Sequence, residues 1–250
     1  MGDFVGMVRI AACQTPEFLG DTDAALACVE RFASQTDADL LLFPECFLQG
    51  YLVNEPHIRQ HALSLDSPEF ETVLRRVSPL RQALAIGLIE RAGSRFHNTA
   101  ALIRHGRLLG VYRKVHLVEG EAIFTPGNHF PVFEVAGIRV GINICADTRF
   151  PDTAAAVAAQ GARVLLVPAQ NMMRRAAAEH WKDRHHQIRT ARARETGMWV
   201  VSADVTGTRD GDRIGWGPTS VIAPDGKILD QVKLKCTGTA VAEIATGSYT

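Results

Sequence analysis

Three residues whose side chains could together cleave a carbonyl compound each stand at the end of an apolar stretch. Glu45 follows residues 41–44, Lys114 ends the second arm of a hairpin-like segment, and Cys145 ends the run that begins at Gly137. A strand-to-helix corner exposes a nucleophile at the carboxyl edge of a sheet, where backbone N–H groups point at the atom that it attacks. Because the carboxyl ends of neighbouring strands meet at one crevice, we expect the carboxylate, the ammonium and the thiol to share a site.

The chemistry expected of these groups is acyl transfer through sulfur. A thiol with a pKa of about 8.5 is mostly protonated at neutral pH and needs a base to attack a carbonyl carbon quickly. The charge of Glu45 would raise that pKa, so the glutamate must act by accepting the proton during attack. Lys114 would offset this charge and donate to the oxyanion. Protonated Glu45 would then protonate the leaving amine or ammonia, and water activated by the same carboxylate would hydrolyse the thioester.

Cys46, next to Glu45, is the rival nucleophile. Adjacent side chains on an extended backbone point to opposite sides, so we expect Cys46 to lie in the core. The chain has five cysteines and no CxxC pair. This pattern predicts neither a disulfide framework nor a zinc site, and it favours a reducing, cytoplasmic compartment.

The elements that would position these residues alternate between strands and helices, which indicates an α/β fold. Strands are expected at 8–13, 41–43, 85–89, 98–103, 107–112, 137–145, 164–168, 198–203, 218–223 and 227–232. Helices are expected from Asp21, as a cap, to about Gln35, and at 68–84, 152–160 and 176–196. No repeat, low-complexity tract or linker interrupts the pattern, so we expect residues 1–250 to form a single domain.

Composition excludes several classes of function. Lys and Arg together number 27, as do Asp and Glu, so the whole molecule offers no general attraction for nucleic acid or acidic membranes. No window approaches the ~18 apolar residues of a membrane span. The N-terminal residues also lack the basic and apolar regions of a signal peptide, so we expect neither secretion nor membrane insertion.

Several motifs carry a family resemblance that spans nearly the full chain. The segments are FPE at 43–45, HNTA at 97–100, YRKVHL at 112–117, FTPG at 124–127, VGINICADTRFP at 140–151 and RARETG at 192–197. In order and approximate spacing they resemble the carbon-nitrogen hydrolases of the nitrilase superfamily, and in particular its amidases.

The resemblance implies a four-layer αββα sandwich that dimerises through the face carrying the helix at 176–196. It implies Glu45 as the base, Lys114 as the oxyanion and charge partner, and Cys145 as the nucleophile, with no metal and no organic cofactor. The backbone N–H of Ala146 would complete the oxyanion hole. Many members have an aromatic residue at that position, so Ala146 would widen the pocket.

The family also has a second glutamate that orients the site. The candidates are Glu119 and Glu121, of which we favour Glu121, through charge-assisted hydrogen bonds to Lys114 and to the substrate amide nitrogen. Position relative to the family motifs also assigns to the pocket Tyr51, Asn171, Met172 and Trp181.

The expected reaction is hydrolysis of a small, linear amide to a carboxylic acid and ammonia through a thioester. N-carbamoyl amines could react by the same steps, and nitriles through a thioimidate, so the triad leaves these alternatives open. Arg149, Arg174 or Arg175 could bind a substrate carboxylate, as in family members that act on ω-amides of dicarboxylic acids.

A non-enzymatic alternative is a basic helix flank. Arg175, Lys182 and Arg189 recur every seven residues, a pattern that could bind nucleic acid or an acidic partner. The zero net charge and the lack of interleaved aromatic residues argue against it. The histidines at 180, 185 and 186 lack the i, i+4 spacing of helical metal ligands, so we expect no metal site.

Overall fold

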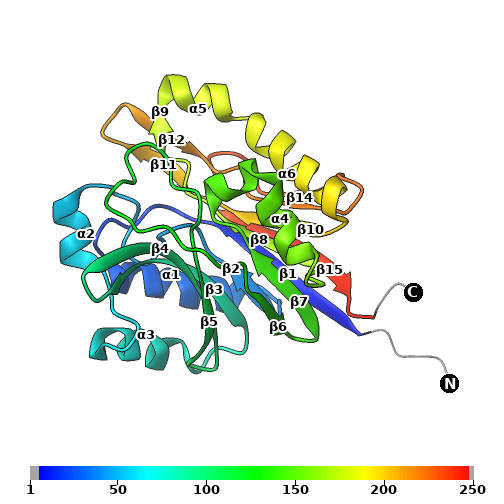
Figure 1. Ribbon diagram of the computed structural model, residues 1–250, viewed down its shortest axis with the longest axis horizontal. Coiled ribbons are helices and arrows are strands. Elements are labelled where there is room, and N and C mark those ends of the chain that lie inside the picture. The colour runs from blue at the N-terminus through cyan, green and yellow to red at the C-terminus, as the bar shows by residue number, and fades with distance from the viewer. Residues whose placement is uncertain (1–5, 248–250) are drawn as a thin grey trace.

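Two six-stranded sheets form the centre of the protein, which the computed structural model describes over residues 6–247 (Figure 1). The first sheet contains, in spatial order, β15 (Gly238–Ala245), β1 (Met7–Gln14), β2 (Leu40–Leu42), β3 (Ala83–Ala92), β4 (Arg95–Arg104) and β5 (Arg107–Arg113). The second contains β14 (Ile228–Gln231), β13 (Ser220–Ile222), β10 (Trp199–Ala203), β8 (Val164–Pro168), β7 (Ile138–Ile142) and β6 (Val132–Val135). A small third sheet contains β11 (Thr206–Arg209), β12 (Arg213–Trp216) and β9 (Met173–Arg174).

The helices are α1 (Thr22–Gln35), α2 (Glu55–His61), α3 (Pro68–Val77), α4 (Pro151–Ala158), α5 (Arg175–Trp181) and α6 (Arg184–Thr196). A 3₁₀ helix occupies Cys145–Arg149. Asp21 caps α1 as expected, since its side chain accepts a hydrogen bond from the backbone N–H of Ala24. Within residues 6–247, none of the helices has the length and apolar character that spanning a bilayer requires.

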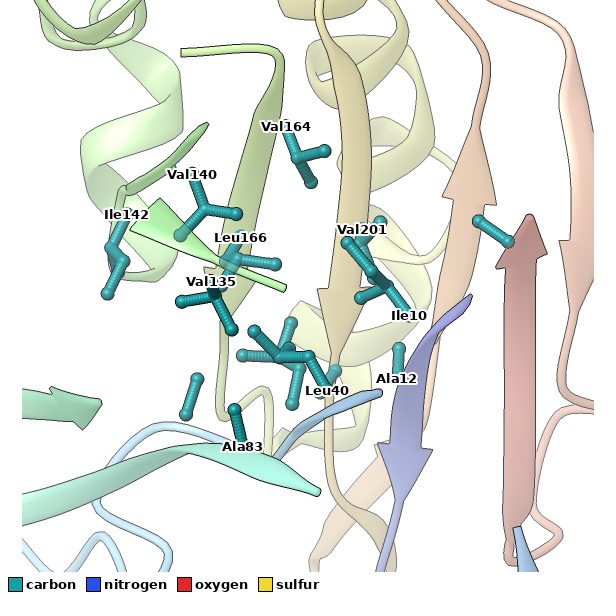
Figure 2. Packing of buried hydrophobic residues seen from close by; sticks show 14 of the residues in the cluster. Ile10, Ala12, Leu40, Ala83, Val135, Val140, Ile142, Val164, Leu166 and Val201 are labelled. Atoms are coloured by element: carbon teal, nitrogen blue, oxygen red, sulfur yellow. The ribbon is translucent and has the colours of Figure 1, made fainter. Parts of the chain in front are cut away.

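Side chains of both large sheets meet in one apolar core. Leu40 of β2 and Leu166 of β8 are among the residues that face each other across it (Figure 2). Because strand side chains alternate, the neighbours Leu41 and Leu165 point to the outer faces of their sheets. Both faces of each sheet are therefore buried, which explains the nearly continuous apolar runs in the sequence.

Helices cover both outer faces. On the first sheet, Phe32 of α1 and Phe70 of α3 pack in one apolar cluster with Leu41. On the second, Val157 of α4 and Ala193 of α6 pack with strand residues of β8 and β10. Burying one such large apolar side chain contributes about 1.5–3 kcal/mol. The result is the four-layer αββα arrangement that the family resemblance implied.

Parallel pairing brings the functional strand ends together. β2 runs parallel to β1 and β3, and β8 runs parallel to β7 and β10. The two sheets also touch at this end, because the backbone N–H of Glu45 donates to the carbonyl of Ala169, 3.3 Å away. The segments after β2, β7, β8 and β10 therefore share one region.

Some predicted elements were wrong. The helix expected at 68–84 ends at Val77, and β3 begins at Ala83. The helix expected at 176–196 is two helices, α5 and α6, although Lys182 and Asp183 between them keep right-handed helical dihedrals. The strand expected at 137–145 ends at Ile142. The expectations also omitted β6, β9, β11, β12, β15 and α2.

Candidate active site

A pocket of about 290 Å³ opens where the strand ends of the two large sheets meet. Glu45, Lys114 and Cys145 line it, so the structure brings together the carboxylate, the ammonium and the thiol that the sequence singled out. Five other residues that were expected there also line the pocket, namely Tyr51, Ala146, Asn171, Met172 and Trp181.

Glu45 lies in the turn after β2, fully buried, and both of its carboxylate oxygens accept hydrogen bonds. Oε1 accepts from Lys114 Nζ at 2.8 Å and from Asn98 Nδ2 at 2.7 Å, and Oε2 accepts from the backbone N–H of Gln170 at 3.1 Å. Burial raises the pKa of Glu45, although the charge of Lys114 opposes this effect. A carboxylate with a raised pKa is better matched to proton transfer near neutral pH.

The turn that carries Glu45 sits directly on β3 at Gly87. A Cβ at this position would lie 2.2 Å from the carbonyl oxygen of Pro44 and 2.5 Å from the backbone nitrogen of Cys46. The Gly87 carbonyl in turn accepts the backbone N–H of Leu48 at 3.1 Å. Only glycine leaves room for the turn at this distance from the strand.

Lys114 follows β5, and its ammonium is 1% exposed. Nζ donates to Glu45 Oε1 at 2.8 Å and to Glu121 Oε1 at 2.9 Å, while its backbone N–H donates to the Asn98 carbonyl at 2.8 Å. Burial alone would lower the pKa of Lys114, but the nearby carboxylates outweigh it and raise the pKa. Lys114 is therefore a permanent cation between two carboxylates.

Of the two glutamates that follow Lys114 in the sequence, Glu121 is the one that contacts it. It is fully buried, and it also accepts hydrogen bonds from the Tyr51 hydroxyl and from the backbone N–H of Val118, both at 2.8 Å. Glu119 is exposed and borders the pocket. The geometry therefore favours Glu121 over Glu119 as the partner of the lysine.

Cys145 begins the 3₁₀ helix, with a φ of 46°. This left-handed conformation costs a non-glycine residue roughly 1–2 kcal/mol, and such strain is typical of functional sites. Burial and then the charge of Glu45 raise the pKa of the Cys145 thiol well above its usual range, with Lys114 opposing them. The sulfur is therefore protonated at rest, and attack on a carbonyl carbon requires a base.

Asp147 holds the corner that contains Cys145. Its Oδ2 accepts the backbone N–H of Ile144 at 3.0 Å and the Tyr112 hydroxyl at 2.7 Å, while Oδ1 accepts the backbone N–H of His116 at 2.7 Å. The carboxyl group is fully buried. It therefore connects the segment after Lys114 to the segment before Cys145.

Asn171 follows β8 and faces the sulfur. Its backbone N–H donates to Asp204 Oδ1 at 2.9 Å, its Nδ2 donates to Asp204 Oδ2, and its Oδ1 lies 3.9 Å from Cys145 Sγ. Asp204 is fully buried, with the Arg189 guanidinium 3.6 Å away. Burial raises the pKa of Asp204, against the opposing effect of Arg189.

The pocket is also lined by apolar residues, namely Ala146, Met172, Met173, Trp181 and Ile188. Arg149 lies over the Trp181 ring, with its guanidinium carbon 5.7 Å from the ring centre. His185 stacks on the same ring at 5.6 Å, and burial lowers the pKa of His185 to about 3, so its imidazole is neutral.

The structure contradicts the alternative of a basic helix flank. Arg189 is 2% exposed and donates to the Ser202 hydroxyl at 3.0 Å and to the Pro218 carbonyl at 2.7 Å. It therefore belongs to the interior and cannot form a surface patch with Arg175 and Lys182. Its burial could not be read from a seven-residue spacing, because its partners come from β10 and from the segment before β13.

The three arginines considered for binding a substrate carboxylate differ in position. Arg174 and Arg175 are exposed and do not line the pocket, whereas Arg149 does. Within residues 6–247, no cluster of three or more His, Cys, Asp or Glu side chains is arranged to hold a metal ion.

Cys46 is fully buried in an apolar cluster that includes Ile58 and Phe124. Its place in the core was expected on the assumption of an extended backbone at this position, and that assumption was wrong. Its φ is 47°, so the backbone there is a turn and not an extended strand.

Sequence reasoning missed Asn98, Asp147 and Asp204. Asn98 Nδ2 donates to Glu45 and, at 3.3 Å, to Glu121 Oε1, so one amide group holds both carboxylates. Asn98 and Asp147 lie inside motifs that the sequence displays, and Asp204 directly follows a predicted strand. These locations could have drawn attention to the three residues, but their roles depend on partners that are distant in the sequence.

Comparison with known proteins gives a consistent result. Residues 9–250 match the carbon-nitrogen hydrolase family. An (R)-stereoselective amidase from Pseudomonas sp. is 32% identical over 194 residues, which cover 77% of this chain and 68% of the relative. An omega-amidase from Homo sapiens is 27% identical over 215 residues, covering 80% and 74%.

Solved structures of an amidase from Nesterenkonia sp. AN1 are similar over almost the whole chain. One mutant of that enzyme, which carries acrylamide added at the active-site cysteine, has a TM-score of 0.82 and 28% identity and covers 95% of this chain and 93% of its own. Another, with the acetamide moiety of fluoroacetamide on the active-site cysteine, has the same TM-score and identity and covers 96% and 91%. The resemblance and the fold class expected from the sequence are therefore confirmed.

Proposed function

This chain belongs to the carbon-nitrogen hydrolase family of the nitrilase superfamily, and we propose that it hydrolyses small, linear amides to carboxylic acids and ammonia. One observation carries the proposal. Glu45, Lys114 and Cys145 line a single pocket, with Lys114 Nζ 2.8 Å from Glu45 Oε1. The named amidases among its relatives support the same substrate class.

The first half of the reaction acylates Cys145. Sγ attacks the amide carbonyl carbon while Glu45 takes the thiol proton, and the carbonyl oxygen becomes an oxyanion that Lys114 and the backbone N–H of Ala146 stabilise. The intermediate collapses when the C–N bond breaks. Glu45 then returns its proton to the leaving nitrogen, which departs as ammonia and leaves a thioester on the sulfur.

The second half hydrolyses the thioester. Glu45 removes a proton from water, and the resulting hydroxide adds to the thioester carbonyl. When the C–S bond breaks, the proton held by Glu45 goes to the sulfur, so the thiol is regenerated and the carboxylic acid leaves. Protein side chains and water account for every bond change, so the proposal requires no metal or organic cofactor.

Glu121 has a different task in this proposal. It pairs with Lys114, keeps the ammonium oriented, and accepts a hydrogen bond from the substrate amide nitrogen. Its bonds from Tyr51 and Val118 support this role, because they hold the carboxylate rigidly.

An ammonia-release assay tests the function. The panel contains simple amides, N-carbamoyl amines and nitriles, each measured with the wild-type protein and with Cys145→Ala as the blank. We expect release from amides that is lost in Cys145→Ala. Turnover of carbamoyl amines or nitriles in preference to amides would reassign the substrate class, and turnover that survives in Cys145→Ala would exclude Cys145 as the nucleophile.

Two further proposals rest on the family resemblance and on composition. We propose that two copies of the chain pair through the face that carries α5 and α6, which light scattering on the purified protein would test. We also propose a cytoplasmic location, because all five cysteines are free.

A further inference from the structure

The side-chain amide of Asn171 has a fixed orientation at the reacting sulfur. Its backbone N–H and its Nδ2 both donate to the carboxylate of Asp204. Rotation of the amide by half a turn would place Oδ1 against that carboxylate, and two acceptors would repel each other. Oδ1 therefore faces Cys145, 3.9 Å from Sγ.

Asp204 is itself held in place, so the orientation does not depend on Asn171 alone. Its Oδ1 also accepts the backbone N–H of Val205 at 2.9 Å, and its own backbone N–H donates to the Thr219 hydroxyl at 2.9 Å. Arg189, fully buried, balances its charge. The pocket thus presents a rigid hydrogen-bond acceptor beside the nucleophile.

This acceptor needs a donor once the amide nitrogen has left and the acyl group is bound to the sulfur. A thiol is a weak donor, and its hydrogen is lost when the sulfur bonds to the acyl carbon. Where the acyl group fills the space beside Asn171, it leaves no room for a water molecule to donate to this oxygen. Asn171 Oδ1 is then left unsatisfied unless the acyl group carries an N–H close to its carbonyl carbon.

We infer that the substrates are amides with an N–H group on the carbon next to the carbonyl, as in α-amino acid amides, and that Asn171 accepts a hydrogen bond from this group. The inference rests on the proposed amidase function and names its substrate class. The charges around the pocket agree with it. The carboxylates Glu45 and Glu119 line the pocket, and a third, Glu121, contacts Lys114, while the cations that line it are Lys114 and Arg149. The excess of negative charge favours an amino or ammonium substituent over a carboxylate.

The other substituent on that carbon is apolar in this inference. Met172, Trp181 and Ile188 line the same pocket as Asn171 and supply apolar surface to it. His185 adds no charge, because its imidazole is neutral, and Arg149 lies over the Trp181 ring. The three groups on the carbon next to the carbonyl thus have different surroundings: the catalytic residues around the carbonyl, Asn171 around the N–H group, and the apolar wall of Met172, Trp181 and Ile188 around the third group. The two enantiomers of a substrate therefore bind differently.

The experiment compares two amides that differ only in this N–H group. They are leucinamide, each enantiomer separately, and 4-methylpentanamide, which has the same carbon skeleton without the amino group. For the wild-type protein we expect kcat/KM for the better enantiomer of leucinamide to exceed that for 4-methylpentanamide by about tenfold or more, as for a hydrogen bond from a charged donor. Equal values for leucinamide and 4-methylpentanamide would overturn the inference.

Two variants test whether Asn171 causes the preference for leucinamide. In Asn171→Ala the preference for leucinamide should fall to about one, because changes in folding or in the sulfur affect both amides and cancel in the ratio. Asn128→Ala removes an exposed asparagine outside the pocket and should retain the wild-type ratio. A ratio that persists in Asn171→Ala would exclude Asn171 as the acceptor. Should that variant fail to fold, the wild-type ratio and the difference between enantiomers still decide the substrate class.

Failure of the inference differs visibly from failure of the proposed function. If the wild-type protein released ammonia from 4-methylpentanamide as fast as from either enantiomer of leucinamide, it would be an amidase of a different substrate class. If it released ammonia from no amide, the proposed function itself would be wrong.

Discussion

The Asp147 carboxylate accepts the backbone N–H of His116 at 2.7 Å, and this bond joins the two segments that carry Lys114 and Cys145. The same carboxylate accepts the backbone N–H of Ile144, directly before the cysteine. A side chain outside the pocket therefore sets the relative position of the ammonium and the sulfur.

Asp147→Asn tests this link. The amide keeps the shape of the carboxylate but replaces one acceptor oxygen with an NH₂ group, which would face a donor. We expect kcat to fall about 10- to 100-fold and the free energy of unfolding to fall by about 1–3 kcal/mol, the range for a buried hydrogen-bonding group left unsatisfied. Steady-state kinetics and urea unfolding measure the two effects. Asp152→Asn, an exposed change in α4, is the control. A kcat within twofold of wild type for Asp147→Asn would contradict the role.

Glu45→Gln separates two effects of the glutamate on Cys145. If the charge of Glu45 acted alone, its removal would lower the pKa of the thiol and speed alkylation. If Glu45 accepts the thiol proton, its removal slows alkylation, and we expect a loss of about 100-fold. The measurement is the rate of labelling by iodoacetamide at neutral pH, followed by peptide mass spectrometry.

Cys236 provides an internal control for this labelling, because it is exposed. Its rate should not change in Glu45→Gln. Faster labelling of Cys145 in the variant would show that the glutamate is not its base.

The two glutamates after Lys114 should differ in their effect on catalysis. Glu121→Gln removes a buried charge that pairs with the ammonium, and we expect kcat/KM to fall by about 100-fold. Glu119→Gln changes an exposed side chain at the pocket edge, and we expect a change below about threefold. The assay is ammonia release from the best amide of the panel. The reverse order of effects would assign the second site glutamate to position 119.

Acid should destabilise the protein through His185 and His186. Burial lowers their pKa values to about 3 and about 4, from 6.5 in an unfolded chain. Between pH 6.5 and about 4 the unfolded chain therefore binds more protons than the folded chain, so stability is present at neutral pH and is lost as the pH falls through this window. We expect the free energy of unfolding to decrease by roughly 1–3 kcal/mol per histidine across it.

Urea unfolding at several pH values measures this slope. His186→Gln should flatten it, whereas His129→Gln, an exposed histidine, should leave it unchanged. A slope that is equal in wild type and His186→Gln would contradict the assignment.

Local patterns in the sequence predicted the alternation of strands and helices and the strand ends that carry Glu45 and Cys145. These features depend on periodicity and on turn residues within a few positions. The partners of Asn98 and Asp204 could not be predicted in the same way. Asn98 bonds to glutamates 53 and 23 residues away in the sequence, and Asp204 bonds to Asn171, 33 residues away.

The burial of charged residues could not be predicted from local sequence patterns either. Arg189 has the sequence surroundings of a solvated helix flank, yet it pairs with Asp204 in the interior. The sequence did not predict the break between α5 and α6. Lys182 and Asp183 keep helical dihedrals, so the helical spacing of apolar residues continues across the break.

Gly87 of β3 lies outside the pocket, yet the position of Glu45 depends on it. Even one methyl group there would push on the Pro44 carbonyl and the Cys46 nitrogen, on either side of Glu45. A mutation at this strand position would therefore act as a change in catalysis, through displacement of a carboxylate, although the residue touches no substrate. Laboratory evolution of new specificities in this scaffold should vary the apolar wall freely and leave this glycine untouched.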